Sequence, residues 1–127
     1  MNNKRFALLM SDFSRLVSQE TIILNEGEAL VCDYESTRCR IEDAERVGIT
    51  GKIIIMIQLE ENKFDFKKIS ELNGDFKLTY DGYISDIDKL GRHYIRTIDT
   101  PSHPRELLTT LSKTVDIYEK ILEQAEK

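Results

Sequence analysis

The residue types that most often carry out catalysis are few in this sequence, and their spacing matches no known catalytic pattern. The two histidines, His93 and His103, and the two cysteines, Cys32 and Cys39, form no CxxC or HExxH pattern, and no GxSxG is present. His103 lies between two prolines, where a solvated side chain is expected. His93, on an expected strand, is expected to be partly buried and hydrogen-bonded. We therefore expect no catalytic residue and no metal site.

The carboxylates also lack the spacing that calcium binding or acid–base catalysis would need. The acidic stretch from Asp81 to Asp88 is not a calcium loop, since the sixth and twelfth positions are Asp86 and Arg92 instead of glycine and glutamate. We interpret it as a solvated turn. Glu60 and Glu61 are adjacent at the end of an expected strand, which places them on opposite faces in water. Acid–base catalysis is not indicated.

Cofactor binding has no support in the sequence either. The glycines are scattered, and no GxGxxG or P-loop spacing is present to bind phosphate. We expect no cofactor, and the protein is not expected to be an enzyme.

Length and charge narrow the class of protein further. A chain of 127 residues fits one domain, 1–127, without a linker or repeat. A net charge of −5 disfavours nucleic acid and anionic membrane surfaces as partners. The longest apolar run, Ile53 to Ile57, is far too short to span a bilayer. The first residues do not resemble a secretory signal, so we expect a cytoplasmic protein with reduced cysteines, a disulfide being the less favoured alternative.

The first half of the chain predicts one helix followed by strands. The stretch Lys4 to Val17 has an apolar stripe at spacings of three and four, as an amphipathic helix requires. A short strand is possible at Thr21 to Leu24, before a turn and the alternating strand Ala29 to Tyr34. The stretch Thr37 to Gly51 is interpreted as a strand and a loop, with a helix from Glu42 as an alternative. Lys52 to Leu59 has the continuous apolar character of a central strand buried on both faces.

The second half predicts two further strands between two helices. Lys63 to Asn73 is expected to be a short helix that Gly74 ends in a left-handed cap. Phe76 to Ile84 alternates as a strand does; Asp81-Gly82 is either a hairpin tip or, as we prefer, a bulge within that strand. His93 to Ile98 follows as a strand, and an amphipathic helix runs from Pro104 to the end.

These elements predict an α+β fold in the order α-β-β-β-α-β-β-α, with an antiparallel sheet of about five strands and three helices. A sheet with three amphipathic helices has more apolar surface than a small domain can bury alone. Self-association or a protein partner would cover the remainder.

The order of elements resembles the class I type III secretion chaperones of the Tir-chaperone, CesT-like kind. The resemblance spans nearly the whole chain and is carried by Phe6-Ala7-Leu8-Leu9 to Leu16-Val17, Ile22 to Glu26 leading into Leu30-Val31-Cys32, Ile69-Ser70-Glu71-Leu72-Asn73, and the final helix with Val115, Tyr118 and Leu122. A rival resemblance is to YbjN-like regulatory domains. It is carried by Leu72-Asn73, Phe76-Lys77-Leu78 and Asp81-Gly82.

The chaperone resemblance implies a homodimer in the bacterial cytoplasm that keeps a secreted effector competent for secretion without ATP. It implies that the N-terminal effector segment wraps around the dimer in an extended form, with apolar side chains in grooves and its backbone added to a strand edge. The effector-binding candidates are Phe6, Leu9, Phe13, Leu30, Cys32 and Ile41. The dimer-interface candidates are Phe66, Ile69, Leu72 and Phe76. Phe13→Asp, if Phe13 is exposed, is expected to keep the fold and lose the effector.

Overall fold

The computed structural model describes residues 4–18, 22–25 and 27–125 as ten elements along the chain. They are α1 (Lys4–Ser18), β1 (Leu30–Tyr34), β2 (Thr37–Asp43), the 3-10 turn η1 (Ala44–Val47), β3 (Lys52–Gln58), α2 (Phe66–Asn73), α3 (Phe76–Thr79), β4 (Tyr83–Ile87), β5 (Gly91–Asp99) and α4 (Pro104–Ala125). The predicted terminal helices, the central strand β3 and the antiparallel five-stranded sheet are confirmed.

The five strands form one antiparallel sheet in the order β1-β2-β3-β5-β4. A two-residue turn joins β1 to β2, and both of its residues, Glu35 and Ser36, have positive φ, as a type I′ turn requires. In this hairpin Cys32 lies directly opposite Cys39. The sheet leaves β1 and β4 as its two edge strands.

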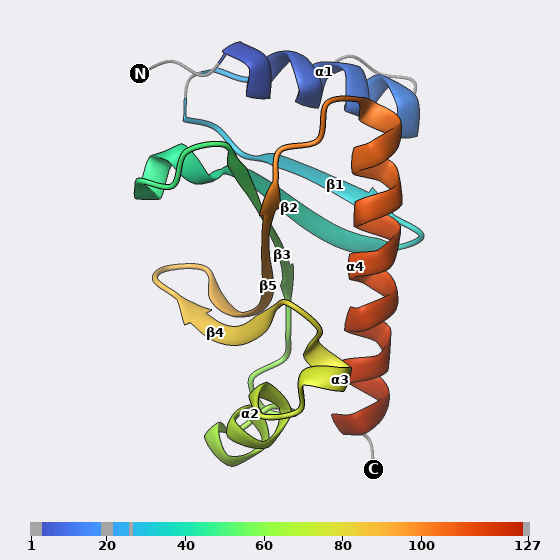
Figure 1. Ribbon diagram of the computed structural model, residues 1–127. Helices are drawn as coiled ribbons and strands as arrows, with labels where there is room; N and C mark the ends of the chain where they lie inside the picture. The colour runs from blue at the N-terminus through green and yellow to red at the C-terminus, as the bar shows by residue number, and fades with distance from the viewer. Residues whose placement is uncertain (1–3, 19–21, 26, 126–127) are drawn as a thin grey trace.

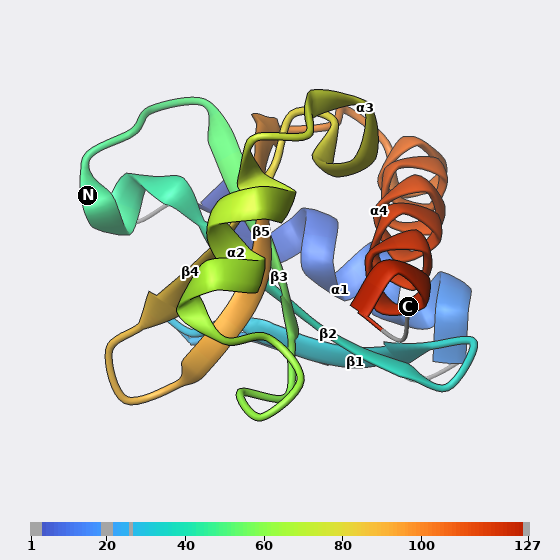
Figure 2. The ribbon, with the colours of Figure 1, turned by 90° about the horizontal axis from the view of Figure 1, so that it is seen from below.

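One core lies between the sheet and the two terminal helices. In Figure 1, α1 lies across one end of the molecule and α4 runs along its length, and Figure 2 shows both helices on the same side of the sheet. Alternate residues of β3 face these helices, because side chains of a strand alternate between its two faces. The buried members of this core are Phe6, Leu9, Met10, Phe13, Leu30, Cys39, Ile41, Ile53, Ile55, Ile57, Leu107, Leu111 and Val115.

A second core lies at the other end of α4, where α2 and the start of β4 meet the sheet. Its buried members are Leu59, Phe64, Leu72, Ile84, Tyr94, Ile117 and Ile121. Tyr94 lies fully buried at its centre, and its hydroxyl donates to the carbonyl of Thr79, 2.8 Å away. The aromatic ring and the hydrogen bond together fix the segment between α3 and β4 to the sheet.

The prediction of a strand from Phe76 to Ile84 was wrong in its first half. Residues Phe76–Thr79 form the short helix α3, because the Asp75 side chain accepts hydrogen bonds from the backbone N–H groups of Lys77 and Leu78. The strand begins only at Tyr83. Asp81-Gly82 is therefore neither a hairpin tip nor a bulge within a strand.

Two further predictions need correction. Gly74 does not end α2 in a left-handed conformation, because its φ is −80° and its ψ is −12°. α2 ends there because the Asp75 side chain caps the N-terminus of α3. Residues Ile22 to Leu24 form no strand, and Thr21 lies outside the described residues. The alternative helix after Glu42 is realised only as the single turn η1.

The close approach of Gly82 to the sheet gives a first prediction. A Cβ at Gly82 would lie 2.5 Å from the Tyr94 hydroxyl oxygen and 2.6 Å from the Ile95 carbonyl oxygen. We expect Gly82→Ala to lower the free energy of unfolding by about 1–3 kcal/mol, since backbone must move to admit the methyl group. Urea denaturation measures the change. In the control, Gly74→Ala, the added Cβ meets nothing closer than 3.5 Å, so equal losses for both variants would contradict the prediction.

Candidate protein-binding surfaces

A groove of about 840 Å³ lies between the start of α1, the segment before β1 and the loop around η1. Its lining is Lys4, Phe6, Ala7, Leu8, Leu24, Asn25, Gly27, Glu28, Asp43, Glu45, Arg46, Gly48 and Thr50. We call it the α1 groove. Leu8 in its lining is 65% exposed, and Val47, beside the lining residues of η1, is 66% exposed. The groove therefore has one accessible apolar side chain, Leu8, among charged lining residues, and Val47 lies beside it.

The wall formed by η1 is held in place by local hydrogen bonds. The Asp43 side chain accepts from the backbone N–H of Glu45, and Ala44 is fully buried. Gly48 has a φ of 86° and ends the turn, its N–H bonding to the carbonyls of Ala44 and Glu45. The loop thus has a defined shape, although Val47 at its tip points into solvent.

The six predicted effector-binding residues do come together in space, but in the interior of the chain. Phe6, Leu9, Phe13, Leu30 and Ile41 are buried members of the first core, and Cys32 packs against it. Phe6 alone also lines the α1 groove. Phe13 has no exposed surface, so it cannot serve for a test that required an exposed side chain. Phe13→Asp would bury a charge and unfold the protein. A mutational test of effector binding should instead use exposed residues of the groove.

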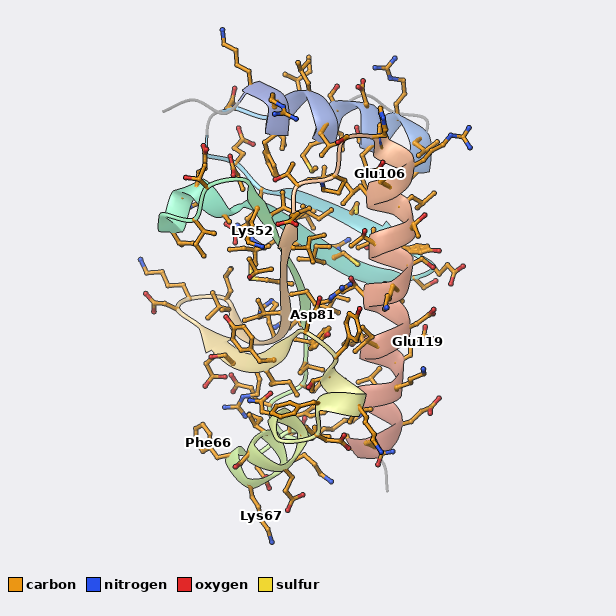
Figure 3. The ribbon with its side chains drawn as sticks, in the orientation of Figure 1. Lys52, Phe66, Lys67, Asp81, Glu106 and Glu119 are labelled. Carbon is orange, nitrogen blue, oxygen red and sulfur yellow. The ribbon has the colours of Figure 1, made fainter. Side chains whose placement is uncertain are left out.

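The four predicted dimer-interface residues divide between surface and core. Phe66 is 76% exposed and Phe76 is 77% exposed, whereas Leu72 is buried in the second core and Ile69 packs partly against it. Figure 3 shows Phe66 projecting from α2 away from the sheet and α4. Phe66 and Phe76 are therefore available to contact another chain. Sequence reasoning missed that Tyr80 and Tyr83 nearby in the chain are exposed as well.

Two buried arginines on β5 contact two of these exposed aromatic residues, Phe66 and Tyr80. Arg92 donates from Nε and Nη2 to the two carboxylate oxygens of Asp86, at 2.7 and 3.1 Å, and from Nη1 to the carbonyl of Phe64. Its guanidinium lies over the ring of Phe66, 4.9 Å from the ring centre. The arginine thereby fixes both ends of the segment that leads into α2.

Arg96 lies four residues further along β5, on the same face as Arg92, and makes similar contacts. Its Nε and Nη2 donate to the two carboxylate oxygens of Asp81, at 2.6 and 3.0 Å, in a bidentate ion pair. Its Nη1 donates to the hydroxyl of Thr114 on α4. Its guanidinium and the Lys113 ammonium both lie over the ring of Tyr80. Asp81 and Asp86, predicted to belong to a solvated turn, instead neutralise two buried cations.

The two edges of the sheet differ in how open they are. The Asn73 side chain, at the end of α2, donates to the carbonyl of Ile84 and accepts from its N–H, at 3.0 and 2.7 Å. It thus takes the place of a neighbouring strand at β4. In the part of the chain that the structure describes, β1, at the other edge, is paired only with β2. The edge at β1 is the better place for another chain to add a strand.

The remaining candidate residues lie where structural roles account for them. His93 is buried, and its Nδ1 donates to the Gly91 carbonyl oxygen 2.9 Å away, while His103 is exposed. Within residues 4–18, 22–25 and 27–125, no three His, Cys, Asp or Glu side chains gather as they would to hold a metal ion. In the same ranges no helix has the length and apolar character needed to cross a bilayer.

The Arg92–Asp86 pair gives a prediction on pH dependence. Hydrogen bonds from Arg92 lower the pKa of the Asp86 carboxyl. The pair therefore contributes stability that is fully present above the unfolded carboxyl pKa of about 4 and is lost as the pH falls through the lower folded value. We expect Asp86→Asn to have a lower Tm than the parent at pH 7, and the gap to shrink below pH of about 4. Thermal unfolding from pH 7 downward measures it, and a constant gap would contradict this account.

Comparison with known proteins supports the fold. No family model and no curated protein sequence matches the chain. Among solved structures, the crystal structure of the ExsC–ExsE complex contains a chain that matches with a TM-score of 0.60 at 15% identity, covering 99% of this chain and 92% of that one. The predicted α+β fold is confirmed, and the chain shares it over nearly its whole length with that chain of the complex.

Proposed function

We propose that this protein is a dimeric cytoplasmic chaperone that binds the N-terminal segment of a type III secreted effector and keeps it competent for secretion without ATP. The main support is the fold that it shares, over nearly its whole length, with a chain from the ExsC–ExsE complex. The resemblance of its sequence to the class I chaperones points the same way. It acts by binding another polypeptide, not by catalysis.

The α1 groove and the edge of β1 are the proposed contacts for the effector. An extended chain can place alternate apolar side chains against Leu8 and Val47 and bond its backbone to an unpaired strand edge. Of the six residues predicted from the sequence, Phe6 lines the groove, and the other five lie in the first core or pack against it. The groove, and not the buried core, is the surface to mutate.

Co-purification tests the proposal. The tagged chain, expressed in its own bacterium, is expected to bring down a secreted protein whose N-terminal segment alone binds the purified chain. Leu8→Asp with Val47→Asp should weaken that binding at least about thirtyfold, because each change places a charge where an apolar contact forms. Both side chains are exposed, so the fold should be unchanged. Recovery of only a folded signalling protein would overturn the proposal and favour the YbjN-like regulatory alternative.

A further inference from the structure

The cysteine pair in the β1–β2 hairpin has a geometry that the proposed function does not use. Cys32 and Cys39 are directly opposite each other in the antiparallel register, so both side chains lie on the same face. The Cα atoms of opposite residues are about 4.5–5.5 Å apart, inside the range of about 4.4–6.8 Å that disulfides span. Both are free thiols and the chain has no other cysteine. The register thus places their Cα atoms within the range that a disulfide can span.

The two thiols differ in how accessible they are. Cys39 is fully buried in the first core, and its Sγ donates to the carbonyl of Thr37, 3.5 Å away. Cys32 is only partly buried at the margin of that core. A small molecule in solvent therefore reaches Cys32 first, and Cys39 reacts second, by attack on the Cys32 sulfur of the mixed disulfide.

We propose that Cys32 and Cys39 form a reversible disulfide in the folded chain by exchange with a small-molecule disulfide of the glutathione type. The Cys32 thiolate attacks one sulfur of the reagent, which forms a mixed disulfide and releases one thiolate. The Cys39 thiolate then attacks the Cys32 sulfur and releases the second thiolate. Two protein thiols are oxidised, the reagent is reduced to two thiols, and the two protein protons pass to the released thiolates. The inference does not depend on the proposed chaperone function.

The position within the hairpin makes this bond a reducible one. In an antiparallel ladder, hydrogen-bonded and non-hydrogen-bonded residue pairs alternate along the strands. The pair that flanks a two-residue turn, here Tyr34 and Thr37, is of the hydrogen-bonded type. Cys32 and Cys39 are thus also of the hydrogen-bonded type, whose side chains lie farther apart than in the other type. A disulfide there draws the strands together, and strained disulfides are the more easily reduced ones.

The surroundings of the thiols set the rate of the exchange. Burial, with a smaller effect of Asp33, raises the pKa of Cys32 to about 11. Burial, the neighbouring Cys32 and Asp33 raise the pKa of Cys39 to about 12. Because the thiolate is the reacting form, exchange is slow at neutral pH and its rate should rise about tenfold for each pH unit between about 7 and 9.

Alkylation and mass spectrometry test the inference on the full chain. The reduced protein is equilibrated at pH of about 8 with mixtures of oxidised and reduced glutathione, quenched with acid and treated with a thiol-alkylating reagent. The expected product is a monomeric chain about 2 Da lighter, with both cysteines protected, whose fraction follows the glutathione ratio in both directions. A chain that stays reduced at every ratio, or that collects only stable glutathione adducts or interchain disulfides, would overturn the proposal.

Single variants test the order of attack. Cys39→Ala leaves the accessible Cys32, which should collect a glutathione adduct that persists. Cys32→Ala leaves the buried Cys39, which should remain reduced over the same period. Equal reaction of the two variants would overturn the assigned order, and circular dichroism shows whether each variant is folded.

Discussion

Asp81→Ala should lower the free energy of unfolding by about 3 kcal/mol, although the aspartate itself is half-exposed. The loss arises at Arg96, whose side chain is 6% exposed and would keep its charge in the interior without the carboxylate that neutralises it. Its hydrogen bond to Thr114 would remain, but a hydroxyl carries no charge. The change also frees the segment that carries Tyr80. Urea denaturation measures the difference.

The control for this prediction is Asp99→Ala. Asp99 forms a 2.9 Å ion pair with Lys52, but both side chains are well exposed. Exposed pairs contribute less than about 1 kcal/mol, because water already solvates both charges. If Asp81→Ala lowers the free energy of unfolding no more than Asp99→Ala does, the bidentate ion pair between Asp81 and Arg96 does not stabilise the fold as proposed.

Phe66→Asp combined with Phe76→Asp should convert the proposed dimer to a monomer. Both side chains are more than three-quarters exposed in the single chain, so the substitutions leave its core intact. In a dimer, each would place a charge where an apolar side chain is covered, and we expect the dimer Kd to rise at least about thirtyfold for each site. Size-exclusion chromatography with light scattering, at micromolar concentration, measures the mass.

The groove variants are the matched control. Leu8→Asp with Val47→Asp adds the same charge at two other exposed apolar positions and should leave the dimer unchanged while it reduces effector binding. A parent chain that is monomeric at micromolar concentration would contradict the dimer. Loss of the dimer in the groove variants would show that the two surfaces have been assigned wrongly.

The main elements could be predicted because their apolar patterns are long. The stripe from Phe6 to Leu16 repeats over several turns, and the isoleucines of β3 suit only a buried strand. The segment from Phe76 to Tyr80 could not be assigned in this way, since one helical turn is too short to show its period. Alternation of Phe76, Leu78 and Tyr80 therefore looked like a strand, and the cap formed by Asp75 was the missed signal.

The candidate surfaces were harder to predict, because the sequence does not show which apolar residues are exposed. Phe13 and Phe66 both lie in amphipathic helices, yet Phe13 has no exposed surface and Phe66 is about three-quarters exposed. The roles of Asp81 and Asp86 could have been predicted from Arg92 and Arg96. These arginines flank Tyr94 on one face of a strand, and buried cations require carboxylate partners.

The amide of Asn73 also limits how these molecules can assemble through their sheets. Polymerisation into a fibre needs two open edges on every molecule, so that each added chain offers a new edge to the next one. Here one edge is occupied at Ile84 by the chain's own side chain. Strand pairing at β4 must therefore first displace the Asn73 amide, which disfavours open-ended aggregation through the two edges of the sheet.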